Sequence, residues 1–239
     1  MLLLATDSSG RSGSIALARG NADNSCELLE VVPLAGGTFS AQLVPQIAAL
    51  LAKHGFSKHD IGAFAVASGP GSFTGLRIGL AAIKGLAEIL EKPIAAVSLL
   101  EAVAVGARAQ GRVLALLDAG RGEAYCGDYD IAGNWAQLRT ERLIKRGDLF
   151  SEAQRGQRPS SEPRNTLTGG ATLATSDPSL AEAARAAGLS VSLGEAIDAG
   201  TIARLGWRKI EAGETVSPEQ LEANYIRRTD AEILAQVNR

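Results

Sequence analysis

The sequence contains few of the side chains from which metal centres and disulfide frameworks are built. Its 239 residues include only 2 cysteines, 2 histidines and 4% aromatic residues. Cys26 and Cys126 cannot form a framework of bridges, which predicts a chain that folds in a reducing cytoplasm. His54 and His59 lack the i, i+3 or i, i+4 spacing of helical metal ligands, so we expect both to be solvated. The sequence therefore predicts no metal cofactor, and it offers no recognisable set of catalytic residues.

The sequence also has no large excess of charge of one sign and no long apolar run. The 24 basic and 26 acidic residues give a net charge of −2, so any contact with RNA is expected to be local or made through a partner. No stretch approaches the roughly 18 apolar residues of a membrane span. The N-terminal MLLLATDSS lacks the basic region and the apolar length of a signal peptide. These absences predict a soluble cytoplasmic protein without a membrane partner.

Hydrophobic residues make up 46% of the sequence, and their pattern predicts alternating strands and helices. Apolar residues between Leu43 and Leu51 recur with helical spacing, with Ser40 as the candidate N-cap and Gly55 just beyond the end. Pro45 falls late for a first turn, so we expect either a kink or a helix that begins there. A capping box, SLLE, is expected to open a later helix at Ser98. Strands are expected at Leu2–Thr6, Ser14–Arg19, Cys26–Val32, Ala63–Ser68 and within KPIAAV, and a long helix at Thr74–Leu90.

The pattern then restarts in the second half of the chain. RVLALLD repeats a buried strand that ends in aspartate before a glycine turn, as LLLATD does near the N-terminus. Two halves that each begin strand, aspartate, turn, strand, strand predict a duplicated α/β fold with mixed sheets. We assign residues 1–110 and about 200–239 to a first subdomain and 111–199 to a second. The polar segment 151–165 in the second subdomain is expected to be a mobile loop.

A glycine-rich segment, ASGPGSFTGLRIGLAAIKG, runs from Ala67 to Gly85. It matches neither the Walker A loop, because Leu76 and Arg77 follow its second spaced glycine, nor the dinucleotide fingerprint. Gly75 and Gly79 instead share one side of the expected helix with small neighbours. Two glycines inside a helix cost roughly 1 kcal/mol each relative to alanine, so a compensating close contact is expected. Either the chain's own sheet or a second subunit could supply it.

Two further segments could contact a nucleotide. The hydroxyl-rich DSSG turn follows a buried strand, as phosphate loops of sugar kinases do, but the same residues favour an ordinary tight turn. Asp7 and Asp118 could be catalytic carboxylates or could simply cap turns at strand ends. The basic RR of ANYIRR near the C-terminus could contact acidic protein or RNA phosphate, or only aid solubility. The candidate nucleotide-loop residues are Asp7, Ser8, Ser9, Gly169 and Gly170.

The block SGPGSFTGLRIGLAAIKGL, followed by KPIAAVSLLEAVA, resembles the most characteristic segment of the bacterial TsaB family. The resemblance extends to LLLATDSSGRSGSIAL, DAGRGEAYCGDYD, LTGG and LEANYIRR, and it weakens between about 140 and 165. Many members of the family carry a histidine just before the first long helix, where this chain reads GGTFSAQ. No role is therefore carried over to that position.

The resemblance implies an actin-like ATPase fold of the sugar kinase and Hsp70 superfamily. It implies a non-catalytic subunit that supports TsaD, the enzyme that transfers a threonylcarbamoyl group to adenosine 37 of ANN-decoding tRNAs. The implied partners are TsaD, the small ATPase TsaE and a second copy of the chain, with tRNA reached only through the complex. The partner interface is expected on the two long N-terminal helices, at Leu43, Ile47, Leu50, Pro70, Phe73, Thr74, Gly75, Arg77, Ile78, Gly79, Ala82, Ile83 and Leu86.

An enzyme acting alone is the alternative. It would be an ATP-dependent kinase or hydrolase of the same superfamily that uses Asp7 with the DSSG and LTGG loops. The scaffold interpretation implies no cofactor, or at most weak or interface-bound ATP or ADP. A peptidase function is disfavoured, because the helix that matches the metal-binding helix of TsaD carries no HxxxH pair.

Overall fold

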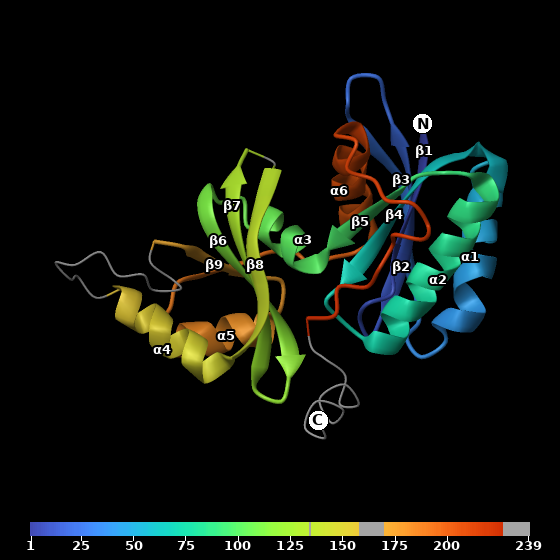
Figure 1. Ribbon diagram of the computed structural model, residues 1–239. Coiled ribbons are helices and arrows are strands. Elements are labelled where there is room, and N and C mark those ends of the chain that lie inside the picture. The colour runs from blue at the N-terminus through green and yellow to red at the C-terminus, as the bar shows by residue number, and fades with distance from the viewer. Residues whose placement is uncertain (134, 158–169, 227–239) are drawn as a thin grey trace, which may run out of the picture. The chain divides into compact units, whose positions relative to one another are not determined.

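The computed structural model describes residues 1–133, 135–157 and 170–226. The chain divides into two units, one formed by Met1–Ala102 with Ile197–Asn224, the other mainly by Val103–Ala196. Each unit is built on its own five-stranded sheet (Figure 1). Within the described residues, no helix combines the length and apolar character needed to span a bilayer.

The sheet of the first unit contains β1 (Leu2–Asp7), β2 (Gly13–Gly20), β3 (Cys26–Leu34), β4 (Ile61–Gly69) and β5 (Ile94–Ser98). Its strand order is β3-β2-β1-β4-β5. The strands β1, β2 and β3 form an antiparallel meander, whereas β1, β4 and β5 run parallel. Parallel strands need crossover connections, and helices supply these here. All five strands were predicted from the apolar pattern, and the mixed sheet is confirmed.

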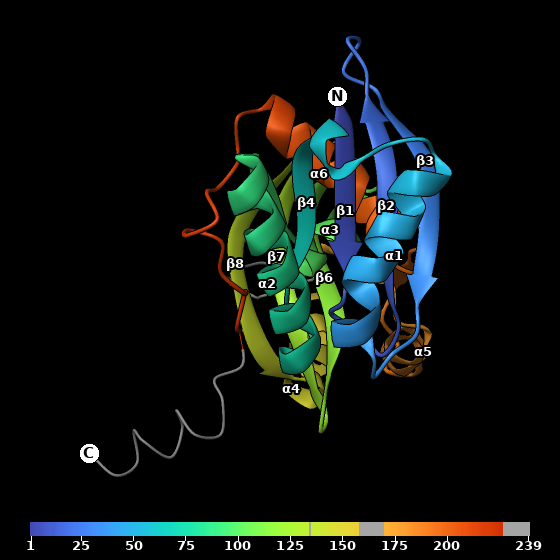
Figure 2. The ribbon, with the colours of Figure 1, turned by 90° about the vertical axis from the view of Figure 1, so that its right-hand side faces the viewer.

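Helices cover both faces of this sheet. One face carries α1 (Phe39–Lys53) and α2 (Phe73–Leu90), which lie side by side (Figure 2), and the other carries α6 (Ala199–Glu211). Successive residues of β4 show the division: Phe64 and Val66 belong to the core beneath α1 and α2, whereas Ala65 contacts Gly206 of α6. A short 3-10 helix, η1 (Lys58–Asp60), precedes β4, and α3 (Leu99–Gly106) follows β5.

The start of α1 differs from the prediction. The N-cap is Thr38 rather than Ser40, which lies inside the helix, and the helix runs through Pro45 instead of beginning there. The predicted end is confirmed, because Gly55 follows the last turn with a positive φ of 74°. At the start of α3 the predicted cap is also found, since the Ser98 hydroxyl accepts a hydrogen bond from the Leu100 N–H at 3.2 Å.

The glycine side of α2 faces the chain itself. Ser72 caps the helix by accepting a 3.3 Å hydrogen bond from the Gly75 N–H. Gly75 and Gly79 are buried, and a Cβ atom at either position would collide with Ser8 in the turn after β1. The expectation that these two glycines admit a second subunit is therefore wrong. Their close contact is the chain's own Ser8 turn.

The second unit repeats the topology of the first. Its sheet contains β6 (Gly111–Gly120), β7 (Glu123–Ala132), β8 (Trp135–Lys145), β9 (Thr172–Thr175) and β10 (Val191–Leu193) in the order β10-β9-β6-β7-β8. Again three strands form an antiparallel meander and two further strands run parallel to the first of them. The predicted internal duplication is thus confirmed at the level of strand order.

The helices of the second unit are α4 (Arg146–Gln157) and α5 (Pro178–Ala186). Leu149 of α4 and Leu180 of α5 are fully buried against Leu114 and Leu116 of β6. The segment expected as a loop from residue 151 begins as helix, because α4 extends to Gln157. The remainder of that expected loop, 158–165, lies outside the described residues.

The segment after α6 continues to pack within the first unit. Val216 exchanges backbone hydrogen bonds with Ile94, and Leu221 is buried in the core beneath α1 and α2. The Asn224 N–H donates to the Ser68 carbonyl at 2.7 Å. This segment therefore holds the end of β4, just before the glycine-rich connection to α2.

Two glycines of α2 provide a matched test of this packing. A methyl group at Gly75 would meet the Ser8 backbone carbonyl, which cannot rotate away, whereas at Gly85 nothing lies within 4 Å. Gly75→Ala should lower the free energy of unfolding by about 1–3 kcal/mol. Gly85→Ala should raise it by roughly 0.5–1 kcal/mol through helix propensity. Urea denaturation of the two variants measures both values, and a Gly75→Ala protein as stable as the parent would contradict the close contact.

Candidate functional site

Asp7 stands at the end of β1, where the sequence offered the DSSG segment as a candidate nucleotide loop. The side chain is only 7% exposed. Its Oδ1 atom accepts hydrogen bonds from the Ser9 N–H at 2.9 Å and from the Ser9 hydroxyl at 2.6 Å. Burial raises the pKa of Asp7, the Ser9 hydrogen bonds oppose that rise, and the nearby carboxylate of Asp198 adds to it. The carboxylate thus closes a turn on its own chain.

The turn that Asp7 closes is attached to the beginning of α2. The Ser9 carbonyl accepts a 2.6 Å hydrogen bond from the N–H of Ser72, and the Ser8 hydroxyl donates to the Gly75 carbonyl at 2.8 Å. Both serines are buried. Of the two interpretations of the DSSG segment, this geometry supports a structural turn, because the Ser8 hydroxyl bonds to α2 and the Ser9 hydroxyl bonds to Asp7 within the turn.

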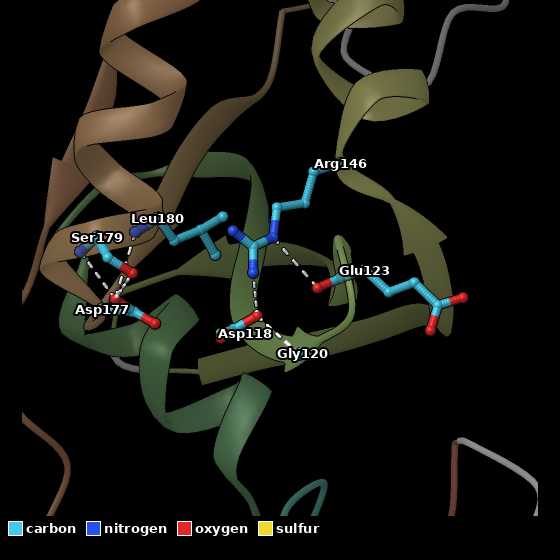
Figure 3. Close-up of polar contacts among 7 residues, drawn as sticks. All are labelled: Asp118, Gly120, Glu123, Arg146, Asp177, Ser179 and Leu180. Atoms are coloured by element: carbon cyan, nitrogen blue, oxygen red, sulfur yellow. Dashed lines mark hydrogen bonds and ion pairs between the residues drawn. The ribbon is translucent and has the colours of Figure 1, made fainter.

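Asp118 occupies the equivalent position at the end of β6 and is held differently (Figure 3). Its Oδ1 atom accepts a hydrogen bond from the Gly120 N–H at 2.8 Å and pairs with a guanidinium nitrogen of Arg146. Arg146 is anchored in turn by a 3.3 Å hydrogen bond from its Nε to the Glu123 carbonyl. The nearby Asp177 caps α5. The carboxylate of Asp118 is therefore charge-paired within its own unit.

The other candidates for ligand contacts contribute little within the described residues. Gly170 is exposed with a positive φ of 71°, while Gly169 and the arginines of ANYIRR lie outside the described part of the chain. His54 is half-buried with its Nε2 atom 2.8 Å from Glu30, so the expectation of a solvated side chain is wrong for it. No group of three potential metal ligands occurs among the residues that the structure describes.

Pairing with His54 and Lys53 has an electrostatic consequence at Glu30. The hydrogen bond from Lys53, at 2.6 Å, and the contact with His54 lower the pKa of the Glu30 carboxyl. The three side chains connect the end of α1 to β3 at the surface. An exposed pair of this kind contributes little to stability, and we assign it no functional role.

The outward sides of α1 and α2 form a largely apolar surface on the first unit, with Arg77 as its charged member. Leu43, Ile47 and Leu50 point into the core, and the exposed side of α1 carries alanines together with Val44, Pro45 and Gln46. On α2 a single arginine, Arg77, lies among small and aliphatic residues, with its guanidinium carbon 3.7 Å from the centre of the Phe73 ring. We define the two-helix surface as Ala41, Val44, Pro45, Ala48, Ala52, Phe73, Thr74, Arg77, Ile78, Ala81, Gly85 and Ile89, all exposed or half-buried.

The predicted interface residues separate into two groups. The exposed or half-buried group, which can meet a partner, is Phe73, Thr74, Arg77, Ile78, Ala82 and Leu86. The buried group is Leu43, Ile47, Leu50, Pro70, Gly75, Gly79 and Ile83, and for these the prediction of an accessible interface is wrong. Most of the buried aliphatic ones face the first unit's own core, and the two glycines face the Ser8 turn.

The alanine side of α1 was missed by the sequence reasoning. Ala41, Ala48 and Ala52 recur at helical spacing opposite the leucine stripe, and that recurrence is the signal that could have identified them. The larger aliphatic residues Leu43, Ile47 and Leu50 were predicted to contact the partner. They pack against the sheet instead, because their side chains bury more apolar area there than alanines would.

Asp7 yields a prediction about pH. Because burial raises its pKa above the ordinary value of 3.8, the folded protein keeps this proton over a window in which the unfolded chain has lost it. The contribution of Asp7 to stability is complete below the unfolded pKa and is lost as the pH rises through the folded pKa. Asp7→Asn cannot titrate, so its unfolding free energy relative to the parent should increase as the pH rises above the ordinary aspartate pKa of 3.8. Denaturation at several pH values measures this difference, and a difference that does not change with pH would contradict the raised pKa.

Comparisons with known proteins place these features in a family. The TsaD family model, described as tRNA N6-adenosine threonylcarbamoyltransferase, matches residues 31–198. The tRNA threonylcarbamoyladenosine biosynthesis protein TsaB of Escherichia coli K12 is 38% identical over 150 residues, which are 61% of this chain and 63% of that protein. TsaB of Bacillus subtilis 168 is 36% identical over 161 residues, which are 66% of this chain and 69% of that protein. The chain thus matches about two thirds of the length of these relatives.

A solved structure extends the likeness over almost the whole chain. YeaZ from Pseudomonas aeruginosa superposes with a TM-score of 0.69 at 26% identity, covering 94% of this chain and 99% of that one. The two mixed sheets of equivalent order, together with this likeness, identify the actin-like ATPase-type fold. The chain belongs to the TsaB family.

Proposed function

We propose that this chain is a non-catalytic subunit of the complex that makes threonylcarbamoyladenosine in tRNA, and that it acts by binding TsaD. Its relatives are named for tRNA threonylcarbamoyladenosine biosynthesis. In this proposal TsaD transfers the threonylcarbamoyl group to adenosine 37 of ANN-decoding tRNAs, and tRNA is reached through the complex. The ATPase TsaE joins the assembled pair, and the site of action is the cytoplasm.

The observation that carries the proposal is the two-helix surface. Exposed apolar patches on soluble proteins commonly mark sites of protein association. Alanine at Ala41, Ala48 and Ala52 would let another helix approach α1 closely, since no long side chain stands between the backbones. Arg77 adds a directional contact at one end of α2. An interface of standard size, about 1,200–2,000 Å² in total, can be built around two such helices.

TsaD is the occupant that fits best. Residues 31–198 of this chain match the family model of TsaD, so that TsaD is expected to carry an equivalent pair of helices. Two such pairs packed face to face would form a four-helix arrangement. A second copy of this chain offers the same pair, so we propose that a homodimer forms through the same surface in the absence of TsaD and that the two dimers compete.

The two strand-end aspartates support a subunit without its own chemistry. The carboxylate of Asp7 is buried and bound to Ser9, and that of Asp118 is paired with Arg146. In each aspartate the Oδ1 atom is already bound within its own unit, so we derive no phosphoryl-transfer step from them.

Placing a charge on the two-helix surface tests the docking proposal. Ala48→Lys should weaken binding to purified TsaD by about tenfold or more, because an ammonium group would be buried without a partner. The free energy of unfolding should change by less than about 0.5 kcal/mol, since the position is exposed and both residues favour helix. Calorimetric titration with TsaD measures the first effect and urea denaturation the second.

Ala186→Lys is the matched control. Ala186 is also an exposed alanine in a helix, α5, but it belongs to the second unit and lies off the two-helix surface. This variant should bind TsaD as the parent does. Equal binding by both lysine variants would refute docking through this surface.

Nucleotide titration separates the proposed scaffold from a kinase or hydrolase acting alone. Because Asp7 and Asp118 are engaged within the chain, the isolated protein should bind Mg²⁺-ATP and ADP weakly or not at all. Titration calorimetry with ATP, with and without Mg²⁺, makes the measurement. Tight, Mg²⁺-dependent binding would instead support the enzyme.

A further inference from the structure

The Ser8–Ser9 turn after β1 is joined to α2 by hydrogen bonds, and the carboxylate of Asp7 closes this turn. Asp7 binds Ser9 through both its N–H and its hydroxyl. The Ser9 carbonyl then accepts from the N–H of Ser72, the N-cap of α2. The hydroxyl of Ser8, which lies between Asp7 and Ser9 in the sequence, donates to the Gly75 carbonyl in the first turn of the helix. A continuous path therefore leads from one buried carboxylate to the start of α2.

Close packing reinforces these bonds. A Cβ at Gly71 would lie 2.6 Å from the Ser9 carbonyl, and one at Gly75 or Gly79 would overlap Ser8. No side chain separates the turn from the first two turns of α2, and protein interiors packed at this density transmit a shift rather than absorb it. A displacement of the Ser8–Ser9 turn must therefore displace the helix that rests on it.

The same two turns of α2 carry part of the two-helix surface. Phe73, Thr74 and Arg77 are exposed on the outer side of the helix, while Gly75 and Gly79 on its inner side contact the turn. Only the thickness of one helix separates the contacts with Ser8 from the exposed residues. The position of those residues is thus set by the turn beneath them.

We propose that Asp7 is a positioning residue for docking: by closing the Ser8–Ser9 turn it holds the N-terminal half of α2 where its outer side, with Arg77, meets the partner. The proposal rests on the docking function proposed above. In this role Asp7 needs no nucleotide, because its carboxylate accepts hydrogen bonds from Ser9 of the same chain. Asp198 is the charged group that faces Asp7 from α6.

Two substitutions at Asp7 distinguish the effect of its hydrogen-bond acceptor on docking from the effect of its negative charge. Asp7→Ala removes the oxygen that holds Ser9, whereas Asp7→Asn keeps a carbonyl oxygen in the same place. We expect Asp7→Ala to weaken binding to purified TsaD by about tenfold and to accelerate hydrogen exchange at the Ser72 and Leu76 amides. Asp7→Asn should stay within about twofold of the parent in affinity and should keep the exchange protection. Should the alanine variant not fold, Ser9→Ala, which removes one of the two bonds, is expected to show the same effects at smaller size.

Three outcomes would decide against the proposal. Unchanged affinity of Asp7→Ala, while Ala48→Lys loses binding, would leave docking intact and reduce Asp7 to a purely structural residue. An equal loss in Asp7→Asn and Asp7→Ala would show that the charge, not the acceptor, matters. Full binding by Ala48→Lys as well would mean that the docking function itself is wrong.

Discussion

The close contact between the Ser8 turn and the glycine side of α2 is the constraint on which the first unit depends. Ser8 fills the space that side chains at Gly75 and Gly79 would occupy, and the turn is held by the buried carboxylate of Asp7. With this contact made, α2 lies flat on the sheet beside α1, and the outer sides of both helices form one surface. In the proposed docking the glycines would act indirectly, because they seat the helix against Ser8 rather than contact the partner.

Duplication has left an aspartate at the same place in both units, and each is used within its own unit. Asp7 is buried and accepts hydrogen bonds from the turn that follows it. Asp118 is more exposed and is paired with Arg146, which the backbone of Glu123 holds in place. Both arrangements satisfy the carboxylate within its own unit.

The two helices divide their residues between the core and the exposed two-helix surface. The leucines and isoleucine of α1 enter the core, where each buries the most apolar area. Alanines and a proline remain outside together with Val44, which is 52% exposed. The small residues among them would permit close helix packing in the proposed docking.

Local pattern in the chain was sufficient for the strands of the first unit, the end of α1, the repeated strand–aspartate–turn pattern and the family, because apolar periodicity and turn residues act over neighbouring positions. It predicted that Gly75 and Gly79 need a close neighbour, but not which one, since Ser8 lies 67 residues from Gly75 in the sequence. The same limit applies to Asp118 and Arg146, and to the assignment of Leu43 and Ile47 to the core. Only the tertiary structure determined these contacts, because the sheet brings segments together that are distant in the sequence. Burial and hydrogen bonding depend on which residues lie opposite a side chain in space.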